Sequence, residues 1–131
     1  MIGLDTNIVI RYLTQDDIKQ SKIATRLIES TLTTKDPGFI TLLTLVEISW
    51  VLESCYDQNK VNITNIVGEL LITKQLLVER KDMAHIALKR CKGFNAGFSD
   101  ALIAVISENE GCDKTYTFDK KAQAAGMELL K

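Results

Sequence analysis

The fold of this chain is decided by its first seven residues, Met1-Ile2-Gly3-Leu4-Asp5-Thr6-Asn7. A short apolar strand here ends in a carboxylate and turns directly into the periodic apolar run 8–13. This pattern is typical of the opening unit of an α/β fold. A strand at the start of such a fold usually lies in the middle of the sheet, so its carboxyl end faces the edge where ligands bind. For Asp5 alone, the simpler interpretation is an N-cap of the helix that follows.

The rest of the chain alternates helical and strand patterns. Apolar residues at helical spacing predict helices over 17–32, 44–55, from 62, from 82 and over 120–125, with a buried helix after Asp100. Short strand patterns lie at 39–41, 75–79, 115–118 and 128–130. This alternation predicts a three-layer α/β/α architecture around a mainly parallel central sheet of four to five strands. We expect one domain spanning residues 1–131.

Composition narrows the function class. The 131 residues are 46% hydrophobic and 25% charged, which is typical of a globular domain. No apolar run reaches the length of a membrane span and the chain opens on a strand, so the predicted location is the cytoplasm. The three cysteines, Cys55, Cys91 and Cys112, are far apart and predict free thiols. A net charge of −1 argues against nucleic-acid binding by bulk electrostatics, but it leaves room for an enzyme that reaches phosphates through bound cations.

Four carboxylates stand out on this skeleton. Asp5 and Asp119 each follow a predicted strand, while Glu47 and Asp100 lie in the first turns of predicted helices. In a parallel sheet with short connections these positions meet at one edge, where the carboxylates repel one another unless a cation joins them. Mg²⁺ or Mn²⁺, as one ion or two, suits carboxylate oxygens. One histidine and no spaced cysteine pair argue against zinc.

Each carboxylate also has a structural interpretation. Glu47 completes a capping box with Thr44, and Asp100 and Asp119 are ordinary helix-start residues. Asp100 fits that interpretation least, because six apolar residues follow it and we expect its side chain to be partly buried. A buried carboxylate is costly without a cation or strong hydrogen-bond donors.

Four segments together resemble the motifs of the PIN-domain family, specifically the VapC-type toxins of bacterial toxin–antitoxin pairs. The segments, in the family's order, are 2–7, 44–52, 98–104 and 117–122. The resemblance implies a PIN-like fold and a metal-dependent endoribonuclease with Asp5, Glu47, Asp100 and Asp119 as catalytic and metal-binding residues. Polar neighbours implied to orient them are Thr6, Asn7, Ser99 and Thr117. The implied partners are an RNA substrate and a VapB-type antitoxin, and members of the family commonly form homodimers.

The chemistry suits these residue types. One or two metal ions can activate a water molecule and cover the charge on the phosphoryl oxygens, so no covalent nucleophile is needed. Arg11, Lys120 and Lys121 are candidates for contact with RNA phosphates, and a solvated helix face is the alternative for each. His85 lies away from the motifs and is interpreted as a packing or surface residue.

The first predicted helix offers a candidate partner surface. Its apolar residues, Ile8, Val9, Ile10, Tyr12 and Leu13, cover more than the single stripe that packing on a sheet requires. An antitoxin could cover them and extend an arginine towards the carboxylates, or a second copy of the chain could do so. The alternative is that all five pack inside the protein.

Two other function classes remain open. One is a PIN-like module that binds without catalysis, its carboxylates serving as helix caps. The other is a phosphatase or response-regulator domain, which is also acidic at the sheet edge. The phosphatase pattern requires an aspartate where this chain has Asn7, and the regulator pattern requires an acidic pair at the first strand, whereas Asp16-Asp17 lies beyond the first helix.

Overall fold

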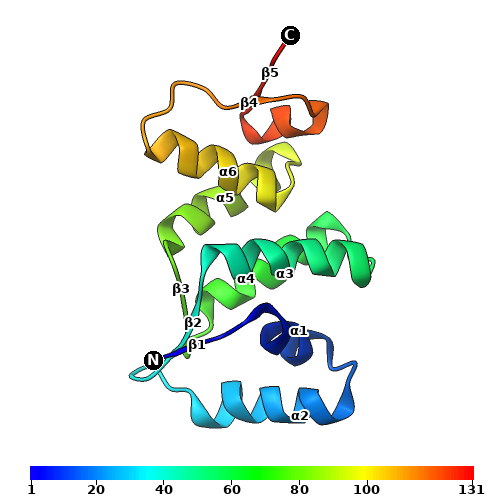
Figure 1. Ribbon diagram of the computed structural model, residues 1–131, viewed down its shortest axis with the longest axis vertical. Coiled ribbons are helices and arrows are strands. Elements are labelled where there is room, and N and C mark those ends of the chain that lie inside the picture. The colour runs from blue at the N-terminus through cyan, green and yellow to red at the C-terminus, as the bar shows by residue number, and fades with distance from the viewer.

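The computed structural model describes residues 1–131. Along the chain the elements are β1 (Ile2–Gly3), α1 (Thr6–Thr14), α2 (Ile18–Arg26), the π-helical turn η1 (Leu27–Thr31), β2 (Gly38–Ile40), α3 (Leu42–Cys55), α4 (Lys60–Ile72), β3 (Leu76–Val78), α5 (Lys81–Phe94), α6 (Phe98–Asn109), β4 (Tyr116–Thr117), the 3-10 helix η2 (Lys120–Ala125) and β5 (Glu128–Leu129). Figure 1 shows them stacked along the long axis: α1 with α2, then α3 with α4, then α5 with α6, and finally η2 with β4 and β5. The predicted α/β class is confirmed.

The strands form two separate parallel sheets. Strands β1, β2 and β3 pair in that order, and β4 pairs with β5. Gly38 of β2 pairs with Ile2 of β1 and with Leu76 of β3, and a Cβ atom there would come within 2.7 Å of the side chains of Leu4 and Leu32. Only glycine therefore lets these two leucines close over the middle of the sheet.

The single central sheet of four to five strands was a wrong prediction. Helices α5 and α6 lie between the two sheets (Figure 1). Strands β1 and β4 are only two residues long, so each offers few backbone hydrogen bonds with which to join the other. As a consequence, Asp119 is positioned by η2, which packs on α5 and α6, and not by a strand next to β1.

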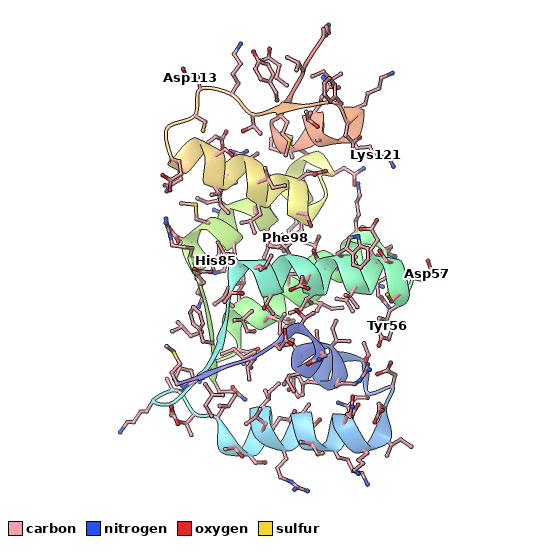
Figure 2. The ribbon with its side chains drawn as sticks, in the orientation of Figure 1. Tyr56, Asp57, His85, Phe98, Asp113 and Lys121 are labelled. Atoms are coloured by element: carbon pink, nitrogen blue, oxygen red, sulfur yellow. The ribbon has the colours of Figure 1, made fainter.

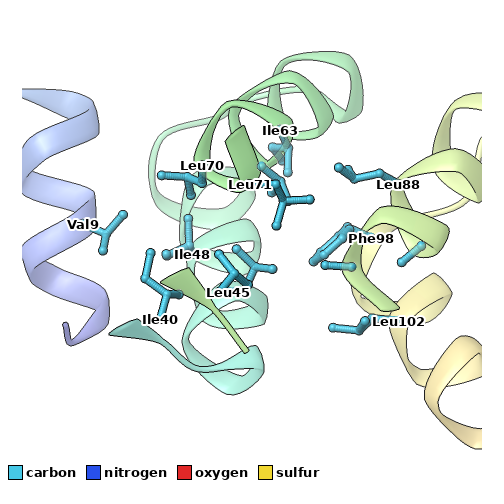
Figure 3. Close-up of a cluster of buried hydrophobic side chains, with 14 of the residues drawn as sticks. Val9, Ile40, Leu45, Ile48, Ile63, Leu70, Leu71, Leu88, Phe98 and Leu102 are labelled. Atoms are coloured by element: carbon cyan, nitrogen blue, oxygen red, sulfur yellow. The ribbon is translucent and has the colours of Figure 1, made fainter. Parts of the chain in front are cut away.

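Helices supply most of the core. Figure 3 shows Leu45 and Ile48 of α3 facing Leu70 and Leu71 of α4, with Phe98 of α6 close by. All five side chains are buried and belong to one continuous apolar cluster that reaches from α1 to η2. The scaffold that positions the polar residues is therefore a single packed unit.

Truncation of Leu45 tests the importance of this core. Leu45 is fully buried, so Leu45→Ala should lower the free energy of unfolding by about 2–5 kcal/mol, through lost apolar burial and the cavity left behind. Leu43 lies on the same helix and is 71% exposed, so Leu43→Ala is the matched control and should cost less than about 1 kcal/mol. Urea unfolding followed by circular dichroism measures both. Equal losses would contradict the packing described here.

The first helix does not provide the exposed apolar surface that its sequence suggested. Val9 and Ile10 are buried in the core, and Ile8, Tyr12 and Leu13 are partly buried against it. The apolar surface of α1 is therefore smaller than the sequence suggested, and Ile8 is the one of the five that lines a groove between α1 and α2. Exposed apolar side chains occur instead on α2, where Ile18 and Ile23 are 76% and 58% exposed.

The helices and the cysteines each have one further property that bears on function. No helix combines the length and the apolar character that crossing a membrane requires. Cys55, Cys91 and Cys112 are free, as predicted, and burial raises the pKa of the Cys91 thiol to about 11.

Candidate functional site

Asp100 and Asp119 line one cavity of about 370 Å³ between α3, α4, α6 and η2. Asp100 lies in the first turn of α6, and its side chain is partly buried, as expected from the apolar residues that follow it. Asp119 caps η2: its Oδ1 accepts a hydrogen bond from the amide of Lys121 at 2.9 Å, and its own amide donates to Oγ1 of Thr117 at 3.0 Å. The local caps therefore hold Asp119 at the rim of the cavity.

The electrostatics of this cavity disfavour a charged Asp100. Desolvation by burial is the main reason that the pKa of Asp100 is raised above its usual value, and the negative charges of Asp119 and Glu53 raise it further. The positive charge of Lys60 acts in the opposite direction. Asp100 is thus a carboxylate whose charged form gains from any additional cation.

Asp5 and Glu47 form a second acidic pair, joined by Thr6. Asp5 is the N-cap of α1, because its Oδ1 accepts a hydrogen bond from the amide of Thr6 at 2.8 Å. The hydroxyl of the same threonine donates to Oε1 of Glu47 at 3.3 Å. A single residue at the start of α1 therefore contacts both carboxylates.

The capping-box interpretation of Glu47 was wrong. Helix α3 begins at Leu42 and not at Thr44, because Thr41 is the N-cap and its side chain accepts a hydrogen bond from the amide of Thr44 at 3.0 Å. Glu47 consequently lies in the second turn, not the first, where its carboxylate cannot cap the helix. It is exposed, and its side-chain hydrogen bond is the one from Thr6.

The two acidic pairs are not gathered into one compact set. No group of three or more Asp, Glu, His or Cys side chains has an arrangement that could hold a metal ion. Asp5 and Asp119 accept hydrogen bonds from the amides of Thr6 and Lys121, and Glu47 accepts one from the hydroxyl of Thr6. The donor chemistry fits a hard divalent cation, because the four predicted ligands all offer carboxylate oxygen atoms.

Of the other polar residues predicted to orient the carboxylates, Ser99 and Thr117 lie beside the pair Asp100 and Asp119, and Asn7 does not. Ser99 lines the cavity and its hydroxyl lies 3.4 Å from that of Ser49, so the contact joins the first turn of α6 to the middle of α3. Asn7 is exposed and lines a different groove, between α1 and α2. Thr117 contacts the backbone of Asp119, as described above.

The three residues predicted to contact RNA, Arg11, Lys120 and Lys121, lie in different environments. Arg11 is held by Gln20, Asp16 and the hydroxyl of Tyr56, at 2.8, 3.2 and 3.2 Å, so its guanidinium joins α1 to α2 and α3. Lys121 lines the cavity that contains Asp100, and Lys120 does not. Figure 2 shows Lys121 on η2, above the C-terminal half of α3.

Sequence reasoning missed three residues that line the same cavity: Trp50, Glu53 and Lys60. Trp50 and Glu53 are three residues apart on α3, so they lie on one face of the helix, and Trp50 is 63% exposed. The signal available in the sequence was a tryptophan three residues before a glutamate within a predicted helix. Lys60 opens α4 and carried no signal of its own in the sequence.

His85 is a surface residue, in agreement with its interpretation from sequence. It is exposed on α5 (Figure 2) and lines a cavity between α4 and α5 to which none of the four predicted carboxylates contributes.

The comparisons with known proteins agree with this architecture. A search of curated proteins found no match. A family model described as the PIN domain matches residues 2–126, which is nearly the whole chain and includes both acidic pairs. The protein belongs to the PIN-domain family.

Proposed function

We propose that this protein is a metal-dependent endoribonuclease and the toxin of a VapBC-type toxin–antitoxin pair. PIN domains are usually metal-dependent nucleases. The observation that carries the proposal for this chain is the cavity where Asp100, Asp119 and Glu53 meet Lys60 and Lys121. The carboxylates offer oxygen ligands for a cation, and the lysines offer positive charge for a phosphate.

Asp5, Glu47, Asp100 and Asp119 would hold one or two Mg²⁺ or Mn²⁺ ions. A bound divalent cation lowers the pKa of a water molecule and neutralises the charge that develops on the phosphoryl oxygens. Asp100 gains most from such a cation, because its charged form is disfavoured by burial and by its acidic neighbours. Thr6 would orient Asp5 and Glu47 together, since it contacts both.

The phosphate of the substrate would lie against the two lysines of the cavity. Neither Lys60 nor Lys121 forms an ion pair within the protein, although the ammonium of Lys60 donates a hydrogen bond to the carbonyl of Asn95 at 3.3 Å. Neither positive charge is therefore neutralised by a carboxylate in direct contact. Trp50 at the same cavity presents an exposed aromatic face on which an RNA base can stack.

An RNase assay tests the proposal. The purified protein should cleave single-stranded RNA in Mg²⁺ or Mn²⁺ and should stop when EDTA is added. RNA that stays intact at every metal concentration, with the protein folded and the metal bound, would favour the non-catalytic binding module.

The proposed partner is a small VapB-type antitoxin that restrains the nuclease, and the proposed setting is the cytoplasm. The groove between α1 and α2, lined by Ile8, Ile23 and Arg11, is a site where its apolar residues could lie. Co-purification with the product of the neighbouring gene tests the partner. A stable complex that leaves RNA cleavage undiminished would contradict the inhibitory role.

A homodimer is the proposed assembly. Exposed apolar side chains such as Phe94 and Phe118, at 67% and 83% exposed, give a second copy an apolar surface to cover. Sedimentation velocity at micromolar concentration measures this, and a sharp monomer boundary would contradict it.

A further inference from the structure

The cavity that holds Asp100 does not end at α6. It shares Lys60 and Thr64 with a second cavity of about 240 Å³, which in turn shares Thr64, Asn65 and Lys92 with a third of about 410 Å³. The second and third cavities lie between α4 and α5, which pack against each other. We call this continuous depression the α4–α5 groove; its polar lining residues are Lys60, Thr64, Asn65, Glu69, His85, Lys89, Lys92 and Asn95.

The α4–α5 groove is basic although the chain as a whole has a net charge of −1. Its lining contains Lys60, Lys89 and Lys92, against a single carboxylate, Glu69. None of these three lysines forms an ion pair. Positive charge is therefore concentrated along one path that leads away from the acidic cavity.

The spacing of the basic residues suits a polyanion that lies along α5. His85, Lys89 and Lys92 follow one another at intervals of four and three, so they share one face of the helix. At a rise of 1.5 Å per residue they extend over about 10 Å, which is the axial length of about three stacked nucleotides. Figure 2 shows His85 on the opposite side of the view from Lys121.

We propose that the α4–α5 groove binds the part of a single-stranded RNA substrate that extends beyond the cleaved bond, with Lys89 and Lys92 on successive phosphates. This inference rests on the proposed function, since RNA in the groove is a substrate only if RNA is cleaved in the cavity that adjoins it. Continuity with that cavity and the excess of unpaired lysines are what favour the substrate strand as the occupant. The contacts are to phosphates, so they supply affinity without sequence preference.

A pair of double variants tests the groove. Lys89→Gln/Lys92→Gln removes two charges from it, and Lys19→Gln/Lys22→Gln removes two charges from α2 at the same i, i+3 spacing. All four lysines are exposed, and Lys19 and Lys22 line neither the groove nor the acidic cavity. Glutamine is a good helix former, so both variants should fold as the wild type does.

Binding of a fluorescein-labelled single-stranded RNA pool of 16 randomised nucleotides is measured by anisotropy, in EDTA so that metal-dependent cleavage cannot occur. Two lost phosphate contacts should weaken binding about tenfold at about 0.1 M salt and reduce the slope of log affinity against log salt by about 1.4. The control double variant should stay within about twofold of the wild type. A second arm compares cleavage of 4-nucleotide and 16-nucleotide pools in Mn²⁺, where only the longer pool should lose efficiency in the groove variant.

The outcomes separate the two proposals. Weaker RNA binding in the groove variant alone supports the groove even if no RNA is cleaved, in which case the proposed nuclease activity fails by itself. Equal losses in both double variants, no loss in either, or no RNA binding by the wild type overturns the groove proposal. Cleavage of both pools with equal efficiency by the groove variant and the wild type overturns it as well.

Discussion

Replacing Asp100 with asparagine should lower divalent-dependent RNA cleavage at least about 100-fold. Asp100 is the carboxylate most strongly disfavoured in its charged form, and the change removes a proposed metal ligand while keeping the shape of the side chain. Single-turnover cleavage of RNA in Mn²⁺ measures the loss. Asp113→Asn is the control, because Asp113 is exposed, forms no hydrogen bond or ion pair through its side chain, and lies in a different part of the molecule (Figure 2). Cleavage at the wild-type rate by Asp100→Asn would remove Asp100 from the mechanism.

The same variant should be more stable than the wild type without metal at pH 7. The pKa of Asp100 is raised in the folded protein, so the folded state binds more protons than the unfolded state and stability falls as pH rises through that pKa. Asparagine carries no charge, so the variant does not lose this stability as pH rises. The advantage should disappear below about pH 4, where the unfolded aspartate is also protonated. Thermal melts in EDTA across this pH range measure the effect, and a variant that is less stable at pH 7 would contradict the electrostatic argument.

Saturating Mn²⁺ should raise the melting temperature of the wild type by about 10 °C. A ligand that binds only the folded state stabilises it by about 2.7 kcal/mol at one hundred times its dissociation constant, and a chain of this size gains about 3–5 °C per kcal/mol. EDTA should reverse the shift, and Asp100→Asn should abolish most of it. Differential scanning fluorimetry measures all three. A melting temperature that does not change when Mn²⁺ is added would favour a scaffold whose carboxylates serve only as helix caps.

The helices of this fold could be predicted because their buried residues repeat at helical spacing. In α4, Ile63, Val67, Leu70 and Leu71 are buried, as their spacing of four, three and one requires. Asp5 was also predicted correctly as a cap, since a carboxylate before a helical run has few other local partners. Helical spacing and helix caps depend on residues within about one helical turn of each other, so both can be predicted from the sequence.

Features that depend on distant segments could not be predicted in the same way. Whether β4 joins β1 depends on how α5 and α6 pack between them, and a two-residue strand carries almost no pairing signal. Glu53 was missed because an exposed glutamate in a helix is ordinary until the fold brings it to Asp100. The starting residue of α3 was also misplaced, because Thr41 and Thr44 are equally good caps by residue type.

We propose that the two acidic pairs, Asp5 with Glu47 and Asp100 with Asp119, act together at one metal centre. The most direct test is a Mn²⁺ titration followed by electron paramagnetic resonance, which measures free Mn²⁺, on the wild type, Asp5→Asn and Asp100→Asn. We predict that the wild type binds Mn²⁺ and that each substitution, one from each pair, weakens binding at least about tenfold, while Asp113→Asn does not. Wild-type Mn²⁺ affinity in either Asp5→Asn or Asp100→Asn would contradict a shared centre.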